Sequence, residues 1–367
     1  MHQAFHLTHQ LAAAAATLLL AATTACATPQ AAPAGGPAAA GPESSGPKTG
    51  GVLKLRSSTD LTDLDVSTAP KTSARSVASY VYNRLLTNQT GEGVKYESFV
   101  LQPELAEKWE VGPDAKSFTF RLRPGVKFQD VAPVNGRALT SADVQWSFEY
   151  WSRGTEFKGK KLPAAQYSWL FENMDRVETP DPLTAVVRFK EPFAPFAAYA
   201  ASQSNPIVPH EIFDADGDLK SRAVGTGPYI LDTANSQAGS RWAFRRNPTY
   251  WKEGRPYLDG LQELVIPADS SAQAAFRTRQ LDYIEPTGCR DAEDLRKGLT
   301  GTPAFEGISV APLNLYINTR VAPLNDVRVR RALAYSINRD EIIKTLQCGK
   351  GEWALSGALG DTFTQEE

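Results

Sequence analysis

Apolar and polar residues alternate between Ser117 and Arg123, in the sequence SFTFRLR. In a β-strand this spacing places every second side chain on one face, which here carries only the apolar residues Phe118, Phe120 and Leu122. Gly112-Pro113-Asp114, just before, has the composition of a turn, because glycine permits positive φ and proline presets φ. The pattern predicts a half-buried strand entered through a turn.

The residues on either side extend this strand into a larger β unit. Trp109 and Val111 alternate with charged residues, as on a second half-buried strand. Pro124-Gly125 closes the central strand, and Val126–Phe128 is expected to begin the next one. Further upstream, the polar segment Pro103–Glu107 favours one short helical turn. Together these residues predict a β-meander with an aromatic inner face.

Two segments carry apolar residues at helical spacing. Ser76–Leu86, with the sequence SVASYVYNRLL, predicts one helix. A second helix is expected to begin after Thr140, which would be its N-cap. Asp143 follows three residues later, as in a capping box, and places an acid near the positive end of the helix. The second helix carries three aromatic residues that we assign to the core, namely Trp146, Phe148 and Trp151.

Several shorter patterns complete the prediction. Val177–Glu191 has the composition of a hairpin whose turn is Thr179–Pro182. Gly225–Pro228 predicts a tight turn with an exposed backbone. Leu315–Thr319 is expected to form a strand, and Asp326–Leu346 a helix capped by its first residues.

The N-terminus differs in composition from the rest of the chain. Leu11–Ala22 is an apolar run too short to span a bilayer, so residues 1–26 are expected to be a signal peptide. Its end, Thr-Thr-Ala-Cys, resembles a bacterial lipobox with Cys26 as the lipidated residue, although Thr23 stands where leucine is usual. The same residues fit ordinary secretory cleavage, which would give a free secreted form. Residues 27–50, rich in Ala, Pro, Gly and Ser, predict a disordered tether.

Composition and charge narrow the function classes. The 367 residues have a net charge of -2 and 42% hydrophobic residues, which fits a globular protein and argues against nucleic-acid binding as the main function. Of the three cysteines, Cys289 and Cys348 could pair in an oxidising envelope, although no sequence pattern predicts that they meet. No CxxC motif is present, which argues against a zinc ribbon.

The order of residues is more specific than these patterns. Residues 105–128, LAEKWEVGPDAKSFTFRLRPGVKF, resemble the signature of the extracellular solute-binding protein family 5, the peptide-, oligopeptide- and nickel-binding components of ABC importers. Further stretches follow the family pattern in the same order: 139–144 (LTSADV), 225–229 (GTGPY), 246–251 (RNPTYW) and 323–332 (PLNDVRVRRA). Arg279 departs from this pattern, since the family has a glycine there.

The resemblance implies an α/β, periplasmic-binding-protein-like fold of two lobes, in its class II, three-region form. Residues 51–86 and 202–315 would form a discontinuous lobe I, and 87–201 a small second region inserted in it. Residues 316–367 would begin lobe II. Family members continue well beyond residue 367, so we expect an incomplete C-terminal lobe and an exposed apolar patch on the helix Asp326–Leu346.

The implied function is that of a substrate-binding lipoprotein of an ABC importer. It would capture a small ligand, most simply a di- or oligopeptide, and deliver it to a membrane permease. We expect a monomer on the extracytoplasmic face, held by a lipid on Cys26 or secreted without it. No cofactor, metal or nucleic acid is expected. Other classes stay open: an envelope sensor or ligand-free scaffold of the same fold, or a secreted hydrolase.

The near wall of the ligand cleft would come from the loop after the first strand, a glycine turn and a crossing strand. Its candidate residues are Ser67, Thr68, Lys71, Thr72, Thr226, Gly227, Tyr316 and Asn318. A structural role for each of them fits the sequence equally well. Asp63 and Asp65, in the same loop, are expected to cap the next helix.

Catalytic chemistry has little support in the residues. His210 is the one histidine after the signal region, and no nucleophile-elbow motif lies near it. Histidines are too few for a His-rich metal site. A carboxylate pair stays open, since 41 acidic residues offer many pairs and no pattern singles one out. The sequence therefore favours binding over catalysis.

Overall fold

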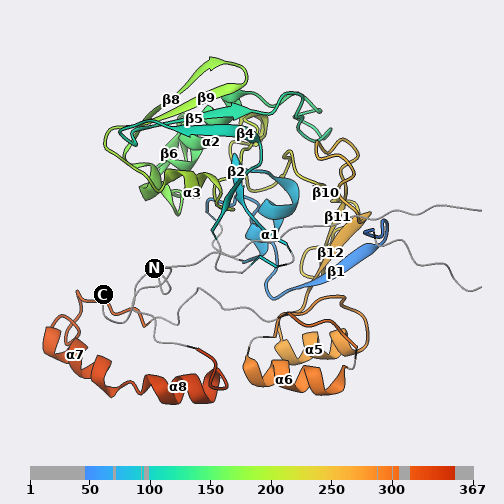
Figure 1. Cartoon of the computed structure of the whole chain (residues 1–367), viewed down its shortest axis with the longest axis vertical. Coiled ribbons are helices and arrows are strands. Elements are labelled where there is room, and N and C mark those ends of the chain that lie inside the picture. Colours follow the sequence, from blue (N-terminus) through green and yellow to red (C-terminus); the bar gives the residue numbers. More distant parts are fainter. Residues whose placement is uncertain are drawn as a thin grey trace, which may run out of the picture. The chain divides into compact units, whose positions relative to one another are not determined.

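The computed structural model describes residues 46–68, 72–91, 93–94, 99–286, 288–299, 301–305 and 315–351. Figure 1 shows the helices and strands of these ranges in chain order. Strand pairing within them builds two four-stranded sheets, with the orders β1-β12-β11-β10 and β4-β5-β9-β8, and two small ribbons. The described fold is therefore mixed α/β, and none of its helices is both long and apolar enough to cross a membrane.

The first sheet joins segments from distant parts of the chain. It contains β1 (Val52–Ser57), β10 (Tyr229–Leu231), β11 (Arg241–Arg246) and β12 (Gly260–Val265). β1 and β12 run parallel along their whole lengths, whereas the other two pairs are antiparallel. The strands come from both ranges assigned to lobe I, and the lobe boundaries themselves stay a prediction.

The second sheet carries the predicted aromatic face. It consists of the antiparallel strands β4 (Ala106–Val111), β5 (Ser117–Leu122), β8 (Met174–Asp181) and β9 (Thr184–Phe189). Two helices supply partner side chains, α2 (Ser141–Trp151) and α3 (Phe196–Ala200). The inner face of β5 is fully buried, as predicted, and Phe196 packs edge-on against its aromatic rings.

Around the hairpin, several local predictions are wrong. Pro103–Glu107 is not helical, because β3 (Leu101–Pro103) pairs with β2 (Leu86–Asn88) and Ala106 begins β4. The backbone N–H groups of this segment donate to carbonyls of residues 84 and 85, so sheet pairing overrides the local helical preference. Val126–Phe128 forms one isolated bridge rather than a strand. The β8–β9 turn lies at residues 182–183, later than predicted.

The first helix begins four residues before the predicted Ser76 and ends five residues before the predicted Leu86. α1 (Thr72–Val81) ends where the Val81 carbonyl accepts a hydrogen bond from the Gly227 N–H, at 2.8 Å. Leu85 and Leu86 are fully buried beyond the helix, and Leu86 opens β2. The apolar spacing thus correctly predicted which residues are buried, but the helix end predicted from it lies several residues too late.

The C-terminal part of the described chain is helical: α5 (Asp269–Arg277), α6 (Cys289–Gly298), α7 (Val327–Ser336) and α8 (Arg339–Leu346). The single helix predicted over Asp326–Leu346 is broken, because Asn338 caps α8 by accepting from the Glu341 N–H at 3.0 Å. Asp326 caps α7, as predicted. Several large apolar side chains are exposed, as expected, namely Val327, Tyr335 and Leu346.

A disulfide joins Cys289, at the start of α6, to Cys348, just after α8. The two cysteines are 59 residues apart in sequence. The sequence left this pairing open, and the structure brings the two together. The closed loop restricts the unfolded chain, which is the usual way a disulfide stabilises a protein.

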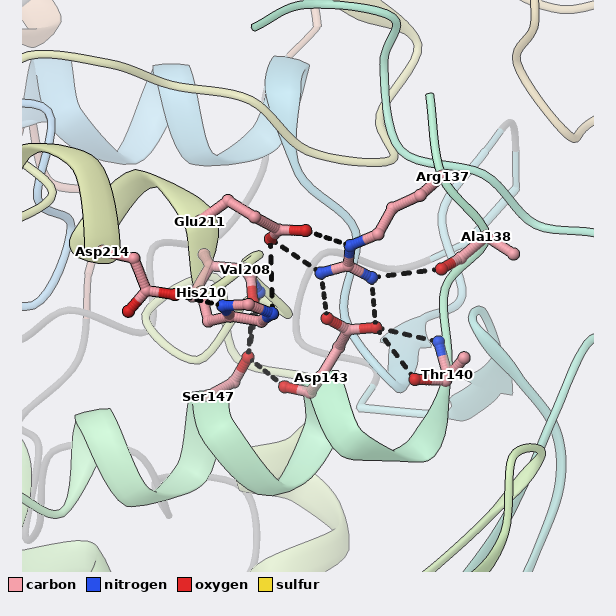
Figure 2. A network of polar contacts seen from close by, with 9 residues as sticks. All are labelled: Arg137, Ala138, Thr140, Asp143, Ser147, Val208, His210, Glu211 and Asp214. Atoms are coloured by element: carbon pink, nitrogen blue, oxygen red, sulfur yellow. Dashed lines mark hydrogen bonds and ion pairs between the residues drawn. The ribbon is translucent and has the colours of Figure 1, made fainter. Parts of the chain in front are cut away.

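A polar network fixes α2 against α4 (Glu211–Asp216), and Figure 2 shows Arg137 at its centre. Arg137 Nη2 donates to Asp143 Oδ1 at 2.6 Å and to Glu211 Oε2 at 2.8 Å. Asp143 also accepts from the Thr140 N–H at 2.9 Å, as the capping-box pattern predicts. One guanidinium therefore neutralises two acids and ties the start of α2 to α4.

The remaining short elements lie between α2 and β8. They are β6 (Glu156–Phe157), β7 (Lys160–Lys161) and the 3-10 turn Ser168–Phe171. The aromatic residues of α2, including Trp146 and Trp151, are buried, as predicted. One large core contains side chains from both sheets together with α1 and α2.

Candidate ligand-binding site

A pocket of about 500 Å³ lies at the carboxyl ends of β1 and β12. Its rim includes the consecutive residues Ser57 and Ser58, which end β1, and Ser76 on α1. The rest of the rim comes from two residues that follow β12, Pro267 and Asp269, and from residues 283–286. In α/β sheets, ligands bind outside the carboxyl ends of parallel strands, and β1–β12 is the parallel pair of this sheet.

Arg56 builds the floor of the pocket. Its Nε donates to the Ile266 carbonyl at 2.9 Å, and its Nη2 to the Pro267 carbonyl at 2.9 Å. Nη2 also pairs with Asp269 Oδ1 at 2.6 Å. The guanidinium thereby fixes the chain that leaves β12 and the first residue of α5. Because its donors and charge are used in this way, Arg56 shapes the pocket instead of offering a free cation.

The opposite wall comes from the segment after α5. Asp282 pairs with Lys54 of β1 through its backbone N–H at 2.9 Å and its carboxylate at 2.8 Å, which holds residues 283–286 beside the strand. Tyr283 is 54% exposed and presents an aromatic surface, with the Glu285 carboxylate close by. Partial burial, with Glu285 second, raises the pKa of the Tyr283 hydroxyl, so it stays a neutral hydrogen-bond donor.

The pocket therefore offers the polar groups that a small ligand requires. The hydroxyls of Ser58 and Tyr283 can donate or accept hydrogen bonds. The hydroxyls of Ser57 and Ser76 already donate to Thr59 and Glu263, so they can only accept, and Glu285 can receive a cation. Polar groups on a partly apolar wall fix orientation, and aromatic surface supplies contact area. This arrangement supports binding of a small polar molecule.

Glu263 lies on β12 beneath this pocket and is only 2% exposed. Its carboxyl group is hydrogen-bonded to the hydroxyls of Ser76 and Tyr80, while Oε2 meets no hydrogen-bond donor among the described residues. Burial raises the pKa of this carboxyl, and these hydrogen bonds oppose the rise only in part. Burial therefore disfavours the ionised form of Glu263, whose hydrogen-bond partner Ser76 lines the pocket.

Replacing Glu263 by glutamine is expected to remove a pH dependence of stability. The folded pKa lies above the unfolded value, so the wild type loses stability as pH rises from the unfolded pKa to the folded one. At pH 7.5 we expect E263Q to be more stable than the wild type by about 1–3 kcal/mol. At pH 4 the two should be alike. Urea unfolding at both pH values measures this.

The matched control is Glu293→Gln, because Glu293 is exposed on α6. Its stability should follow the wild type at both pH values, within about 0.5 kcal/mol. A wild-type stability that does not fall between pH 4 and pH 7.5 relative to E263Q would contradict the assignment of Glu263.

In the loop predicted to line the cleft, Ser67 is buried and Thr68 is half-buried. Ser67 donates from Oγ to Asp65 at 2.5 Å and accepts from Arg153 at 2.8 Å, which uses its hydroxyl inside the protein. Thr68 is half-buried and donates to Asp63 at 3.1 Å. Two further candidates are Lys71, which lies outside the described residues, and Thr72, which begins α1.

The helix-capping role predicted for Asp63 and Asp65 is wrong. Asp65 accepts hydrogen bonds from its own loop, at the Ser67 N–H, and from Tyr150 and Arg153 of the α2 region. Asp63 accepts from the Asp65 N–H at 2.9 Å. Both carboxylates therefore stabilise the loop itself and not the start of α1. They accept hydrogen bonds from nearby backbone N–H groups of the loop, and Asp65 also pairs with the buried Arg153.

Thr226 and Gly227 lie in a buried junction, and the exposed backbone expected for this turn is wrong. Thr226 is fully buried, and its hydroxyl donates to Asn83 Oδ1 at 3.0 Å. The Gly227 carbonyl accepts from the Asn247 side chain at 2.9 Å. Gln129 donates to the Tyr229 carbonyl at 2.7 Å and closes the junction. The structure thus places these residues where they hold α1, β10 and the RNPTYW segment together.

Tyr316 and Asn318 lie on a segment that is irregular rather than a strand. No described strand pairs with residues 315–318, so the alternating pattern has no partner to fix it. Tyr316 is 87% exposed, and the Asn318 side chain accepts from the Arg320 N–H at 3.0 Å. The structure brings neither residue to the pocket at β1 and β12.

The pocket residues themselves were missed from the sequence. The signal that could have found them is the end of a strand: Ser57-Ser58 follows the apolar run of β1, and Pro267 follows that of β12. What the sequence did not reveal is that these two strands, about 200 residues apart, are parallel neighbours in register.

Catalytic groups are not assembled around His210. Its Nδ1 lies 2.5 Å from Asp214 Oδ2, and its Nε2 lies 3.9 Å from Glu211 Oε2. Among the described residues no serine, threonine or cysteine is hydrogen-bonded to His210; Ser147, also drawn in Figure 2, bonds to backbone groups. Likewise, no cluster of three His, Cys, Asp or Glu side chains in the described chain could hold a metal ion.

Comparison with known proteins places this geometry in a family. The model of the bacterial extracellular solute-binding proteins, family 5 Middle, matches residues 100–365. The dipeptide-binding protein of Escherichia coli K12 is 31% identical over 288 residues, which cover 74% of this chain and 51% of that protein. The chain therefore spans about half the length of the curated relatives it matches.

Solved structures show the same fold. The Helicobacter pylori periplasmic binding protein DppA, in complex with the peptide STSA, superposes with a TM-score of 0.70 at 24% identity, over 82% of this chain and 59% of that one. AgaA from A.tumefacien R10, in complex with agropinic acid, gives 0.67 at 28% identity, over 85% and 61%. The predicted α/β periplasmic-binding-protein fold is confirmed. The chain belongs to family 5 of the bacterial extracellular solute-binding proteins, a family of binding proteins rather than enzymes.

Proposed function

We propose that this protein captures a peptide for an ABC importer and that the pocket at the ends of β1 and β12 forms part of its binding site. The observation that carries the proposal is the position of this pocket, outside the carboxyl ends of two parallel strands and walled by hydroxyl groups. Of the relatives named above, one is a dipeptide-binding protein, one was solved with the peptide STSA and one with agropinic acid, so two of the three are linked to peptides.

The chemistry of the pocket suits a peptide. A peptide presents amide N–H and carbonyl groups in every residue. The Ser58 and Tyr283 hydroxyls can donate to and accept from them, and the Ser57 and Ser76 hydroxyls can accept from them. Tyr283 offers an apolar surface to one side chain of the ligand. Glu285 is the one pocket carboxylate whose charge is not neutralised by Arg56, so a cationic group of the ligand fits beside it.

The remaining parts of the function follow as proposals. Residues 1–26 are a signal peptide, Cys26 carries a lipid, and the tether 27–50 holds a monomeric binding domain off the extracytoplasmic face of the membrane. The loaded protein delivers its ligand to permease subunits. Of the near-wall residues, Tyr316 is the most open to a ligand, because it is largely exposed. An envelope sensor of the same fold would share the binding step but not the permease.

A mixed di- and tripeptide pool is expected to raise the melting temperature of the full chain. A ligand at 100 times its Kd stabilises the folded state by about 2.7 kcal/mol, which corresponds to roughly 3–5 °C in a protein of this size. Tyr283→Ala should lose most of this shift, because Tyr283 lines the pocket. Phe99→Ala removes another exposed aromatic side chain and should keep the shift. Differential scanning fluorimetry measures all three proteins.

The result also separates ligand classes. A shift with agropinic acid but not with peptides would replace the peptide by an opine. Sugars and nickel serve as further ligands from other classes. If none of these ligands shifts the melting temperature, the proposed function is wrong.

The lipid anchor has its own test. In a bacterial host the wild-type chain should fractionate with membranes and incorporate radiolabelled palmitate, whereas Cys26→Ala should do neither. Cys289→Ala is the control, since it removes a cysteine that pairs with Cys348 and should leave the label in place. Equal labelling of wild type and C26A would contradict lipidation at Cys26.

A further inference from the structure

A second pocket, of about 350 Å³, shares no lining residue with the first. It lies between the turn after β5, residues 123–126, and the Trp251-Lys252 pair in the loop between β11 and β12. Glu107 of β4 forms part of its rim. Trp251 is the last residue of the RNPTYW motif, and Lys252 follows it. The proposed ligand site assigns no role to this motif.

Two cations face the same indole ring in this pocket. The Arg123 guanidinium carbon lies 5.2 Å from the centroid of the Trp251 ring, and Lys252 Nζ lies 4.9 Å from it. Both distances are within the range of cation–π attraction. The Trp251 indole is itself held in place, because its Nε1 donates to Asn83 Oδ1 at 3.0 Å. A partly buried hydrogen bond therefore positions the ring that the two cations face.

Neither cation is neutralised by a neighbouring acid. The Lys252 ammonium makes no hydrogen bond or ion pair with the described residues; only the backbone carbonyl of Lys252 accepts one, from the Arg255 N–H at 3.1 Å. Arg123 donates through Nε to the Glu104 carbonyl at 2.6 Å, and its two terminal nitrogens make no hydrogen bond or ion pair with the described residues. The nearest buried acid, Glu104, already accepts from Asn83 at 2.9 Å and from Arg84 at 3.0 Å. The Glu104 carboxylate is therefore already paired with Arg84.

Several cations surround Lys252. Burial is the first cause that lowers the pKa of the half-buried Lys252 ammonium; Arg84, Arg123 and Arg255 lower it further, and Glu104 opposes them. Glu107 is exposed at the rim and forms no ion pair with Arg123 or Lys252. An anion in this pocket would therefore relieve repulsion among fixed positive charges.

We propose that this second pocket binds a phosphate group through Lys252 and Arg123. Guanidinium groups match the geometry of phosphate oxygens, and a lysine adds a point charge. A phosphate has enough oxygen atoms to meet both cations at once, and the volume leaves room for a substituent on it. The phosphate comes either free from solution or from a lipid headgroup at the membrane surface.

The test is titration of the full chain with inorganic phosphate at constant ionic strength, followed by calorimetry, and co-sedimentation with phosphatidylglycerol vesicles. Lys252→Met keeps most of the aliphatic stem and removes the charge, so phosphate binding should weaken by about tenfold or more. Lys108→Met is the matched control, because Lys108 is exposed on the neighbouring strand β4 outside the pocket. It should bind like the wild type, and Lys252→Arg should retain binding.

Each outcome decides the proposal. If inorganic phosphate binds and this binding depends on Lys252, the proposal is supported and the phosphate comes from solution. If only the vesicles bind, again in dependence on Lys252, the proposal is supported and the phosphate belongs to a lipid headgroup. Equal phosphate and vesicle binding by wild type and K252M, or no binding of either probe by the wild type, overturns it. Lys252-dependent capture of a polyglutamate peptide alone also overturns it. Matching melting curves show that the variants fold, and peptide binding at the first pocket is scored separately.

Discussion

Asp65→Asn is expected to lower the free energy of unfolding by about 3–5 kcal/mol, because it breaks a buried ion pair from one side. The side chains of Asp65 and Arg153 are each only 1% exposed, and Arg153 Nη2 lies 3.1 Å from Asp65 Oδ2. Asparagine keeps the size of the side chain but leaves the guanidinium as an uncompensated buried charge. Urea unfolding of the purified variant measures the loss.

The surrounding contacts make this loss hard to repair. Asp65 also accepts from the Tyr150 hydroxyl at 2.7 Å and from Ser67 Oγ at 2.5 Å, and the Arg153 guanidinium lies 3.7 Å from the centroid of the Tyr150 ring. Burial, with Asp65 second, raises the pKa of Tyr150, so this phenol stays a neutral donor. The network ties the loop after β1 to the end of α2.

An exposed acid supplies the control. Asp175→Asn removes a partner of Arg176 where both side chains are largely exposed, and exposed pairs contribute only about 0–1 kcal/mol. We therefore expect D175N to unfold like the wild type. If D65N loses less than about 1 kcal/mol, or no more than D175N, the buried pair does not carry the stability assigned to it here.

Gly225→Ala is the second substitution with a large expected effect, a loss of about 3 kcal/mol in the free energy of unfolding or failure to fold. A Cβ at residue 225 would lie 2.2 Å from the Val81 carbonyl oxygen, closer than any real contact. That oxygen accepts the Gly227 N–H, so the backbone would have to move and break the hydrogen bond that ends α1. Thermal and urea unfolding measure the effect.

Gly154→Ala is the matched control, since a Cβ there meets no atom within 4 Å and the backbone needs no positive φ. Its stability should stay within about 1 kcal/mol of the wild type. A stable, soluble G225A protein with wild-type unfolding would show that the junction can shift, and that close packing at Gly225 is not required.

These two predictions differ in what the sequence offered. Gly225 and Gly227 stand out in the chain, but the sequence suggested a turn that needs glycine for its φ. The structure gives another reason: at neither residue is φ positive, and both lie against the backbone of α1, where a side chain has no room. Asp65 was also singled out, yet its partner Arg153 is 88 residues away and was not predicted.

The sequence likewise predicted only part of the candidate site. The sequence directed attention to the loop after β1, whereas the pocket is lined by Ser57 and Ser58 before this loop and by Ser76 after it. It did not select the wall residues Tyr283 and Glu285, because their approach depends on the pairing of Asp282 with Lys54. Nor did it show that Thr226 is sealed inside the junction.

The sequence by itself determined the strand alternation of β5, the capped start of α2 and the family, because each depends on neighbouring residues or on residue order. Phe118 and Phe120 are buried as their spacing requires, and Asp143 accepts the Thr140 N–H as its spacing predicts. Only the tertiary structure decided where α1 ends, that Cys289 meets Cys348, and that the ends of β1 and β12 form a pocket. Each of these depends on segments far apart in the chain, and local spacing carries no information about which distant backbone will supply the partner.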